Sequence, residues 1–197
     1  MTTSPPDSGA GERWGRRVER ATVAGHPCLV YAERPRSVAE LLLDARRWDG
    51  RTFLVEGDRR IGYREHEAAV ARVAHLLASH SIGRGDRVLL LAFNRLEWVV
   101  AFWALQCRGA VAVLGNAWWS DAEARAAVEL IEPAAVISDR IGERALPAVR
   151  VHVPLESLRA AVEASDVTSL EPAAVAEDDA ALIMFSSGTT GTAKGVV

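Results

Sequence analysis

The chain has 197 residues, which fits one sizeable domain, and 49% of them are hydrophobic, which is enough to build a core. The formal net charge is -3 and no basic block is present, so the composition does not indicate a protein that binds nucleic acid by neutralising phosphates. No stretch approaches the ~18 consecutive apolar residues of a membrane span, and the first residues lack the apolar core of a signal peptide. We therefore expect a cytoplasmic protein without a transmembrane segment and without a nucleic-acid partner.

The first part of the chain is expected to carry little regular structure. Residues 1–35 begin with a segment rich in Ser, Pro, Gly and charge, and we expect them to form a mostly disordered tail and lead-in. Ser37 is a candidate N-cap for a helix that runs to Trp48. Residues 52–55 and 59–62 flank a Gly-Asp pair and predict a small β-hairpin.

A long amphipathic helix is predicted for residues 63–79. Four of its residues recur at spacings of four, three and four and so share one face: His66, Val70, Val73 and Leu77. A histidine on such a face is either a titrating functional group or a partly buried side chain at the edge of the core. The pattern favours the second interpretation.

The next segments predict a buried strand over residues 88–93 and a helix over residues 96–107. Asn94 and Glu97 have the spacing of a capping box at the start of this helix. The helix is apolar almost all round, so we expect it to be buried between layers. Its aromatic side chains are expected to pack in the core, and the alternative is that they line a ligand tunnel.

A second buried strand is predicted for residues 110–114. Ser120 and Glu123 then form another capping-box pattern, which opens a further helix. Trp119 directly precedes this cap, where a hydrophobic staple belongs. Trp118 and Trp119 could instead edge a ligand-binding surface, but the pattern favours a structural role.

The chain continues to alternate between strands and helices. Residues 134–138 and 150–153 predict two more strands, each beside a helical stretch, over residues 140–146 and 155–164. Residues 165–180 are acidic and Ala-rich and predict a surface connection. The alternation implies an α/β fold with a layered, largely parallel sheet flanked by helices and right-handed crossovers.

No metal site is predicted from the cysteines and histidines. Cys28 and Cys107 have no metal-type spacing, and each lies in an apolar context that is typical of a reduced core residue. The five histidines do not cluster in the sequence.

The last stretch of the chain is the most informative. Residues 181–185 form an apolar run that predicts a buried strand. The residues after it are mostly small, hydroxyl-bearing or glycine, so the backbone can lie against a phosphate chain while N–H groups, hydroxyls and an ammonium donate to it. The candidate binding residues are Ser186, Ser187, Gly188, Thr189, Thr190, Gly191 and Lys194.

Lys194 strengthens this interpretation because it is the only lysine in the chain. Its compact ammonium suits a tight phosphate site better than a planar guanidinium does. The segment is not a Walker A loop, since Ala193 precedes the lysine and a Gly-Val-Val sequence that predicts a strand follows it. The alternative is a flexible Ser/Gly/Thr end with a stray lysine, which the direct connection to a buried strand disfavours.

The segment resembles the phosphate loop of the adenylate-forming superfamily, which contains acyl-CoA synthetases, firefly-type luciferases and the adenylation domains of peptide synthetases. That loop has the sequence Thr-Ser-Gly-Thr-Thr-Gly-x-Pro-Lys-Gly, and Ser186 and Ala193 replace its usual Thr and Pro. The resemblance extends over residues 36–197 and includes residues 62–66, which are similar to the family's Thr-Tyr-x-Glu-Leu. It implies that residues 36–197 are the incomplete N-terminal part of the large domain of such an enzyme.

The resemblance also implies an activity. Family members use ATP to convert a carboxylic acid into an acyl-adenylate, and acyl-CoA synthetases then transfer the acyl group to CoA. ATP, Mg²⁺, CoA and a small-molecule carboxylic acid are therefore the expected cofactors and substrates, and Ser186 to Thr190 with Lys194 would hold the β- and γ-phosphates. The family's catalytic lysine and its metal-binding segment belong to later parts of the family sequence, so no catalytic residue and no metal ligand are expected here.

We favour a fatty-acid or aryl-acid CoA ligase, with this chain as the N-terminal portion of a longer enzyme and inactive alone. One alternative is an adenylation domain that serves a carrier protein. The other is a truncated, non-catalytic nucleotide-binding or interaction module.

Overall fold

The computed structural model describes residues 17–23, 25–139, 146–147, 149–166, 169–186 and 194–197. It divides into two compact units, Met1–Arg36 and Ser37–Val197. In the first unit, β1 (Val18–Val23) and β2 (His26–Tyr31) form an antiparallel hairpin. The sequence analysis did not anticipate this hairpin within the expected tail and lead-in.

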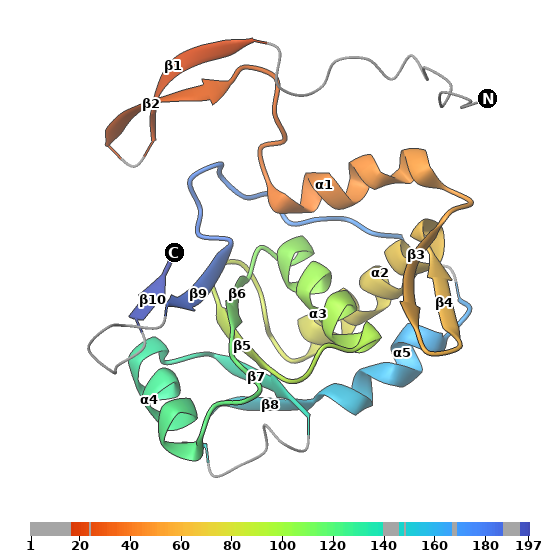
Figure 1. Cartoon of the computed structure of the whole chain (residues 1–197). Coiled ribbons are helices and arrows are strands. Elements are labelled where there is room, and N and C mark those ends of the chain that lie inside the picture. Colours follow the sequence, from red (N-terminus) through yellow and green to blue (C-terminus); the bar gives the residue numbers. More distant parts are fainter. Residues whose placement is uncertain (1–16, 24, 140–145, 148, 167–168, 187–193) are drawn as a thin grey trace, which may run out of the picture. The chain divides into compact units, whose positions relative to one another are not determined.

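The second unit is built on a six-stranded sheet with the order β10-β9-β6-β5-β7-β8 (Figure 1). Strands β5 to β9 are parallel to their neighbours, and β10 alone pairs in the antiparallel direction with β9. The predicted α/β fold with a largely parallel sheet is therefore confirmed. The strands are β5 (Arg87–Leu91), β6 (Val111–Leu114), β7 (Ala135–Ser138), β8 (Val151–Pro154), β9 (Leu182–Ser186) and β10 (Lys194–Val196).

Helices cover both faces of this sheet (Figure 1). One face carries α1 (Val38–Asp44), α2 (Tyr63–Ser79), α3 (Leu96–Cys107) and α5 (Arg159–Glu163). The other face carries α4 (Asp121–Ile131). Along β5, Val88 and Leu90 pack in the first cluster whereas Leu89 and Leu91 pack in the second, which is the period-two alternation of a strand buried on both faces.

Two of the predicted helix caps are observed. The Ser37 hydroxyl accepts from the Glu40 N–H at the start of α1, and a 3₁₀ turn, η1 (Ala45–Trp48), continues this helix to the predicted end. Ser120 and Glu123 form the predicted capping box of α4. Local sequence therefore sets where these helices begin.

The predicted capping box of α3 is wrong. The N-cap is Arg95 rather than Asn94, and no side chain of the cap residue bonds to the helix. A carboxylate from the small hairpin of β3 (Thr52–Glu56) and β4 (Arg59–Gly62) replaces it, because Glu56 Oε1 accepts from the Leu96 N–H at 3.3 Å. Glu97 pairs with Arg59 Nη2 of the same hairpin at 2.8 Å instead.

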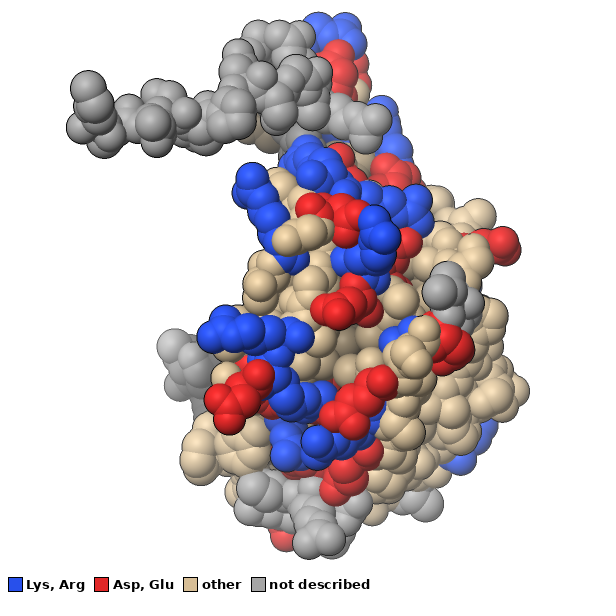
Figure 2. Space-filling model, turned by 90° about the vertical axis from the view of Figure 1, so that its right-hand side faces the viewer, with Lys and Arg blue, Asp and Glu red and all other residues tan. Residues whose placement is uncertain are grey.

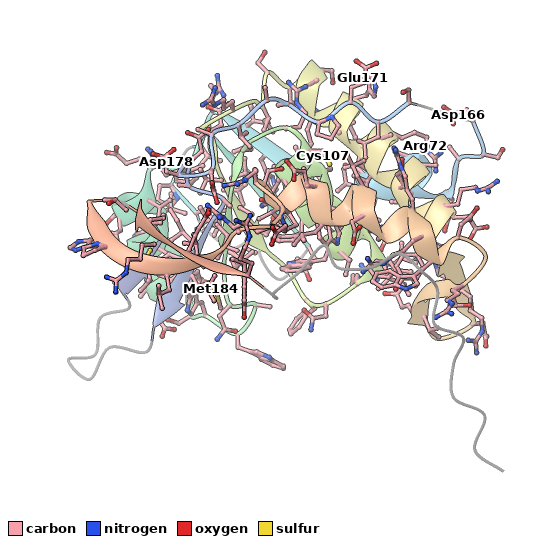
Figure 3. All side chains as sticks on the ribbon, turned by 90° about the horizontal axis from the view of Figure 1, so that it is seen from above. Arg72, Cys107, Asp166, Glu171, Asp178 and Met184 are labelled. Carbon is pink, nitrogen blue, oxygen red and sulfur yellow. The ribbon has the colours of Figure 1, made fainter. Side chains whose placement is uncertain are left out.

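The connection after η2 (Leu155–Leu158) and α5 runs back over α2 and α3 to β9. Arg72 on α2 donates to the carbonyl of Asp166, and the Ala173 N–H donates to the carbonyl of Cys107 at the end of α3 (Figure 3). These bonds hold the described part of the connection against the helical layer. The helical stretch expected at residues 140–146 falls almost entirely outside the described residues.

Candidate functional site

The predicted phosphate loop connects β9 to β10 at one edge of the sheet (Figure 1). The Cα atoms of Ser186 and Lys194 are direct partners in the antiparallel ladder, so the structure brings together the first and last of the predicted binding residues. The five between them, Ser187, Gly188, Thr189, Thr190 and Gly191, lie outside the described residues. The predicted strand–loop–strand arrangement is therefore observed in its two strands.

The core fixes the base of this hairpin. Ile183 of β9 is 7% exposed and packs in the cluster under α4, and the Phe185 ring meets Trp119 at 86° with centroids 4.8 Å apart. At Gly195 of β10 an added Cβ would lie 3.3 Å from Ile183 Cγ2 and 3.4 Å from Ile131 Cδ1. Glycine after the lysine therefore lets β10 approach α4 closely.

The loop begins where a parallel strand ends. Strands β5, β6, β7 and β9 run in the same direction, so their carboxyl ends lie side by side along one end of the sheet. From β5 the chain moves to β6 on one side and later to β7 on the other, which makes the carboxyl ends of β5 and β7 the point where the strand order reverses. In open α/β sheets, ligands bind outside such carboxyl ends.

Asp139 at this reversal point was missed in the sequence analysis. The residue is 7% exposed, and its Oδ2 accepts from the Phe93 N–H at 2.9 Å, which ties the ends of β5 and β7 together. An acidic residue directly after a buried strand is the sequence signal that could have identified it. Its position beside β5 follows only from the strand order.

The two adjacent tryptophans have different environments. Trp119 packs against Phe185, whereas Trp118 is 81% exposed and meets the Phe93 ring at 78° with centroids 4.9 Å apart. The Trp118 N–H donates to Asn116 Oδ1, which holds the turn after β6. Trp118 thus presents an apolar ring at the carboxyl ends of the strands, whereas Trp119 packs against the second core cluster. The hydrophobic staple expected of Trp119 stays a prediction. The aromatic residues of α3 pack against the core: Trp98, Phe102 and Trp103.

No group of His, Cys, Asp and Glu residues within the described ranges is arranged to hold a metal ion. No helix in the described part of the chain is long and apolar enough to cross a membrane.

An α/β sheet that carries a glycine- and hydroxyl-rich loop at its carboxyl edge is typical of nucleotide-binding proteins. The model of the family described as AMP-binding enzyme matches residues 42–197. The chain belongs to this family, the adenylate-forming superfamily that its phosphate loop resembles.

Individual relatives agree with this assignment. The chain is 35% identical over 178 residues to 4-coumarate--CoA ligase-like 4 of Oryza sativa, an alignment that covers 79% of this chain and 32% of that protein. It is 31% identical over 153 residues to the fatty acid--[acyl-carrier-protein] ligase MmaC of Mycobacterium marinum, which covers 72% of this chain and 29% of the relative. The inhibitor-bound N-terminal domain of FACL13 from Mycobacterium tuberculosis superposes with a TM-score of 0.71 at 28% identity, over 82% of this chain and 44% of that chain. The chain spans about a third of the length of the curated relatives it matches.

Proposed function

We propose that this chain supplies the phosphate loop of an enzyme that activates a fatty or aryl carboxylic acid with ATP and then transfers the acyl group to CoA. The observation that carries the proposal is the β9–β10 hairpin, which places Ser186 and Lys194 at the two ends of a Gly/Thr-rich loop in a member of the AMP-binding family. Family membership supports activation of an acid by adenylation. The identity of the acid and of the acceptor is the finer part of the proposal.

The chemistry explains why a loop of this composition is needed. A carboxylate oxygen of the acid attacks the α-phosphorus of ATP, the bond to the β-phosphate bridging oxygen breaks, and pyrophosphate leaves with that electron pair. Negative charge grows on the departing pyrophosphate, and fixed N–H, hydroxyl and ammonium donors stabilise it. In the proposal, the loop donors Ser186, Ser187, Gly188, Thr189, Thr190, Gly191 and Lys194 hold the β- and γ-phosphates. Mg²⁺ enters as part of the ATP substrate.

The acceptor of the acyl group is proposed to be CoA, because 4-coumarate--CoA ligase-like 4 is a relative of this chain. MmaC, also a relative, supports a carrier protein as the alternative acceptor. Because the chain spans about a third of such relatives, we propose that it works as the N-terminal part of a longer polypeptide and is inactive alone. The cytoplasm, which supplies ATP and CoA, is the proposed location.

Exchange of labelled pyrophosphate into ATP tests this function. The longer enzyme containing this chain should catalyse exchange only when a carboxylic acid is present, and benzoic, cinnamic and fatty acids provide a panel. A non-catalytic nucleotide-binding module is the second candidate. That module would bind ATP in a titration yet show no acid-dependent exchange with any member of the panel, and this result would reject the proposed function.

A further inference from the structure

A groove lies on the side of the second unit that carries the β3–β4 hairpin and the start of α2. It has a volume of about 580 Å³, and we call it the hairpin groove. Its lining residues are Asp49, Gly50, Arg51, Thr52, Arg60, Ile61, Gly62, Tyr63, Arg64 and Glu65. Figure 2 shows that cationic and acidic side chains are intermixed over this side of the molecule. The cationic side chains that have no acidic partner are the ones available to an anionic ligand.

The acidic side chains of the hairpin groove already accept hydrogen bonds from neighbouring groups. Asp49 accepts from the Arg64 guanidinium and from the Gly50 N–H, and these donors hold its pKa below the usual range. Glu65 Oε2 accepts from the Gly62 N–H at 2.7 Å. Both carboxylates therefore already accept strong hydrogen bonds.

Arg51 and Arg60 differ from most arginines of this unit. Both are exposed, and neither guanidinium has a carboxylate or hydrogen-bond partner among the described residues. Others in the same unit are paired with acids, as Arg46 is with Glu67 and Arg84 is with Asp179. The hairpin groove is thus lined by two guanidinium groups that have no acidic partner among the described residues.

The rest of the lining contains further hydrogen-bond donors. The Thr52 hydroxyl lies in the same groove, and α2, a helix of 17 residues, begins there. Its N-cap is Gly62, which has no side chain that could accept from the N–H groups of the first turn. Glu65 in the first turn offsets part of the positive charge of the helix start, so the two arginines supply most of the attraction for an anion.

We propose that the hairpin groove binds a pyrophosphate group through Arg51 and Arg60. Planar guanidinium forks match phosphate oxygens in a bidentate way, and two forks suit a ligand with two adjacent phosphates. The groove and the β9–β10 hairpin lie on different sides of the unit, so this site is distinct from the phosphate loop (Figure 1). The ligand is free pyrophosphate or the phosphate chain of a nucleotide.

Isothermal titration of the 197-residue chain, carrying Met184→Lys to limit self-association through the exposed β9–β10 edge, with sodium pyrophosphate at low salt tests the proposal. A Lys194→Ala background reduces the contribution of the phosphate loop to pyrophosphate binding. In this background, Arg51→Gln with Arg60→Gln should weaken pyrophosphate binding about 10-fold or more, because two charge-assisted contacts are lost. A comparison of the affinities for pyrophosphate and for ATP distinguishes the two sources, because a nucleotide site should bind ATP more tightly than free pyrophosphate. AMP is the negative control, since it carries no adjacent phosphates.

Arg150→Gln is the matched control, because Arg150 is another exposed arginine of the same unit without a partner among the described residues. It should change pyrophosphate affinity less than about 2-fold, since it removes the same charge from a different place. Far-UV circular dichroism confirms that each variant is folded. The proposal is wrong if the Lys194→Ala chain does not bind pyrophosphate, if the double substitution leaves binding unchanged, or if Arg150→Gln weakens binding equally.

Discussion

His66 is a titratable side chain in the hydrophobic core, and its burial there is unfavourable. It is 1% exposed, its ring centroid lies 4.5 Å from that of Phe53, and Nε2 has no hydrogen-bond partner among the described residues. Burial lowers the pKa of His66 from 6.5 to about 4. The side chain is thus neutral in the folded protein at neutral pH, and it is more deeply buried than the predicted core-edge position.

Stability should therefore fall as the pH drops from about 6.5 to about 4. In that interval the unfolded chain takes up a proton on His66 and the folded chain does not, so protonation favours unfolding by up to roughly 3 kcal/mol. His66→Leu should remove this part of the pH dependence and be neutral or stabilising by ~1 kcal/mol at pH 7. Urea unfolding across this pH range measures both effects. His75→Leu, at an exposed site on the same helix, is the control, and a large loss of stability in His66→Leu would contradict the account.

The thiol of Cys107 should be inert in the folded protein. Burial, assisted by the charge of Glu67, raises the pKa of Cys107 to about 12, so almost no thiolate is present at neutral pH. We expect one fast-reacting thiol in a titration with a disulfide reagent, Cys28, which is only half-buried. Cys107 should react only with the rate of unfolding. Equal reaction rates at both thiols would contradict the burial of Cys107.

At the scale of elements, the β3–β4 hairpin is fastened to α3 by Arg59. Its guanidinium lies 2.7 Å from Glu56 Oε2 and 2.8 Å from Glu97 Oε1, and Glu97 is 4% exposed. Burial alone would raise the pKa of Glu97, but the hydrogen bond and charge of Arg59 outweigh it and hold the pKa below its usual value. Arg59 thus compensates for the burial of a carboxylate.

Arg59→Ala should destabilise the protein by about 2 kcal/mol, because it leaves the buried carboxylate of Glu97 without its cation. The loss should be largest at neutral pH and shrink as the pH falls through the pKa of Glu97, where the carboxylate becomes protonated. Arg60→Ala, on the same strand and unpaired, is the control and should change stability by less than about 0.5 kcal/mol. Equal effects of the two substitutions in thermal or urea unfolding would contradict this role.

Local patterns predicted most elements of the second unit, and a long-range contact explains the failure at the start of α3. Helix α2 was predicted with its observed ends, because the residues of its buried face recur at helical spacing along the sequence: His66, Val70, Val73 and Leu77. The start of α3 could not be predicted in this way, since the group that caps it is Glu56, 40 residues earlier in the chain.

At the scale of the whole molecule, the strand order decides what lies beside the phosphate loop. Composition and the neighbouring apolar run were enough to predict a loop between two strands. They could not place β9 next to β6 or bring Asp139 beside Phe93, because these neighbours depend on how the whole sheet packs against α4 and α3. The candidate site was therefore predicted as a segment, whereas its surroundings required the structure.

The sheet edge at β9 and β10 should make the chain self-associate. Met184 and Val196 are cross-strand partners that are 55% and 54% exposed, and β10 is a short edge strand. Exposed apolar residues on a strand edge favour association between copies. We expect oligomers or aggregates in light scattering, reduced by Met184→Lys but not by Leu130→Lys at an exposed site on α4. A monomer with a sharp, cooperative melt would contradict this expectation.

The central claim is that Lys194 stabilises the pyrophosphate that leaves ATP. That group is present in the adenylation step and absent when acyl-adenylate reacts with CoA, so the two steps should respond differently to Lys194→Ala. A charge-assisted hydrogen bond is worth about 1.5–3 kcal/mol, which predicts a loss of roughly 10- to 150-fold in adenylation. Lys194→Arg should recover only part of it.

The most direct measurement compares both steps on the same Lys194→Ala variant of the complete enzyme: pyrophosphate exchange, and thioester formation from supplied acyl-adenylate and CoA. The account predicts slow exchange and nearly normal thioester formation. Equal losses in both steps would contradict it, because they would show that Lys194 maintains the fold or a shared site rather than holding the leaving pyrophosphate.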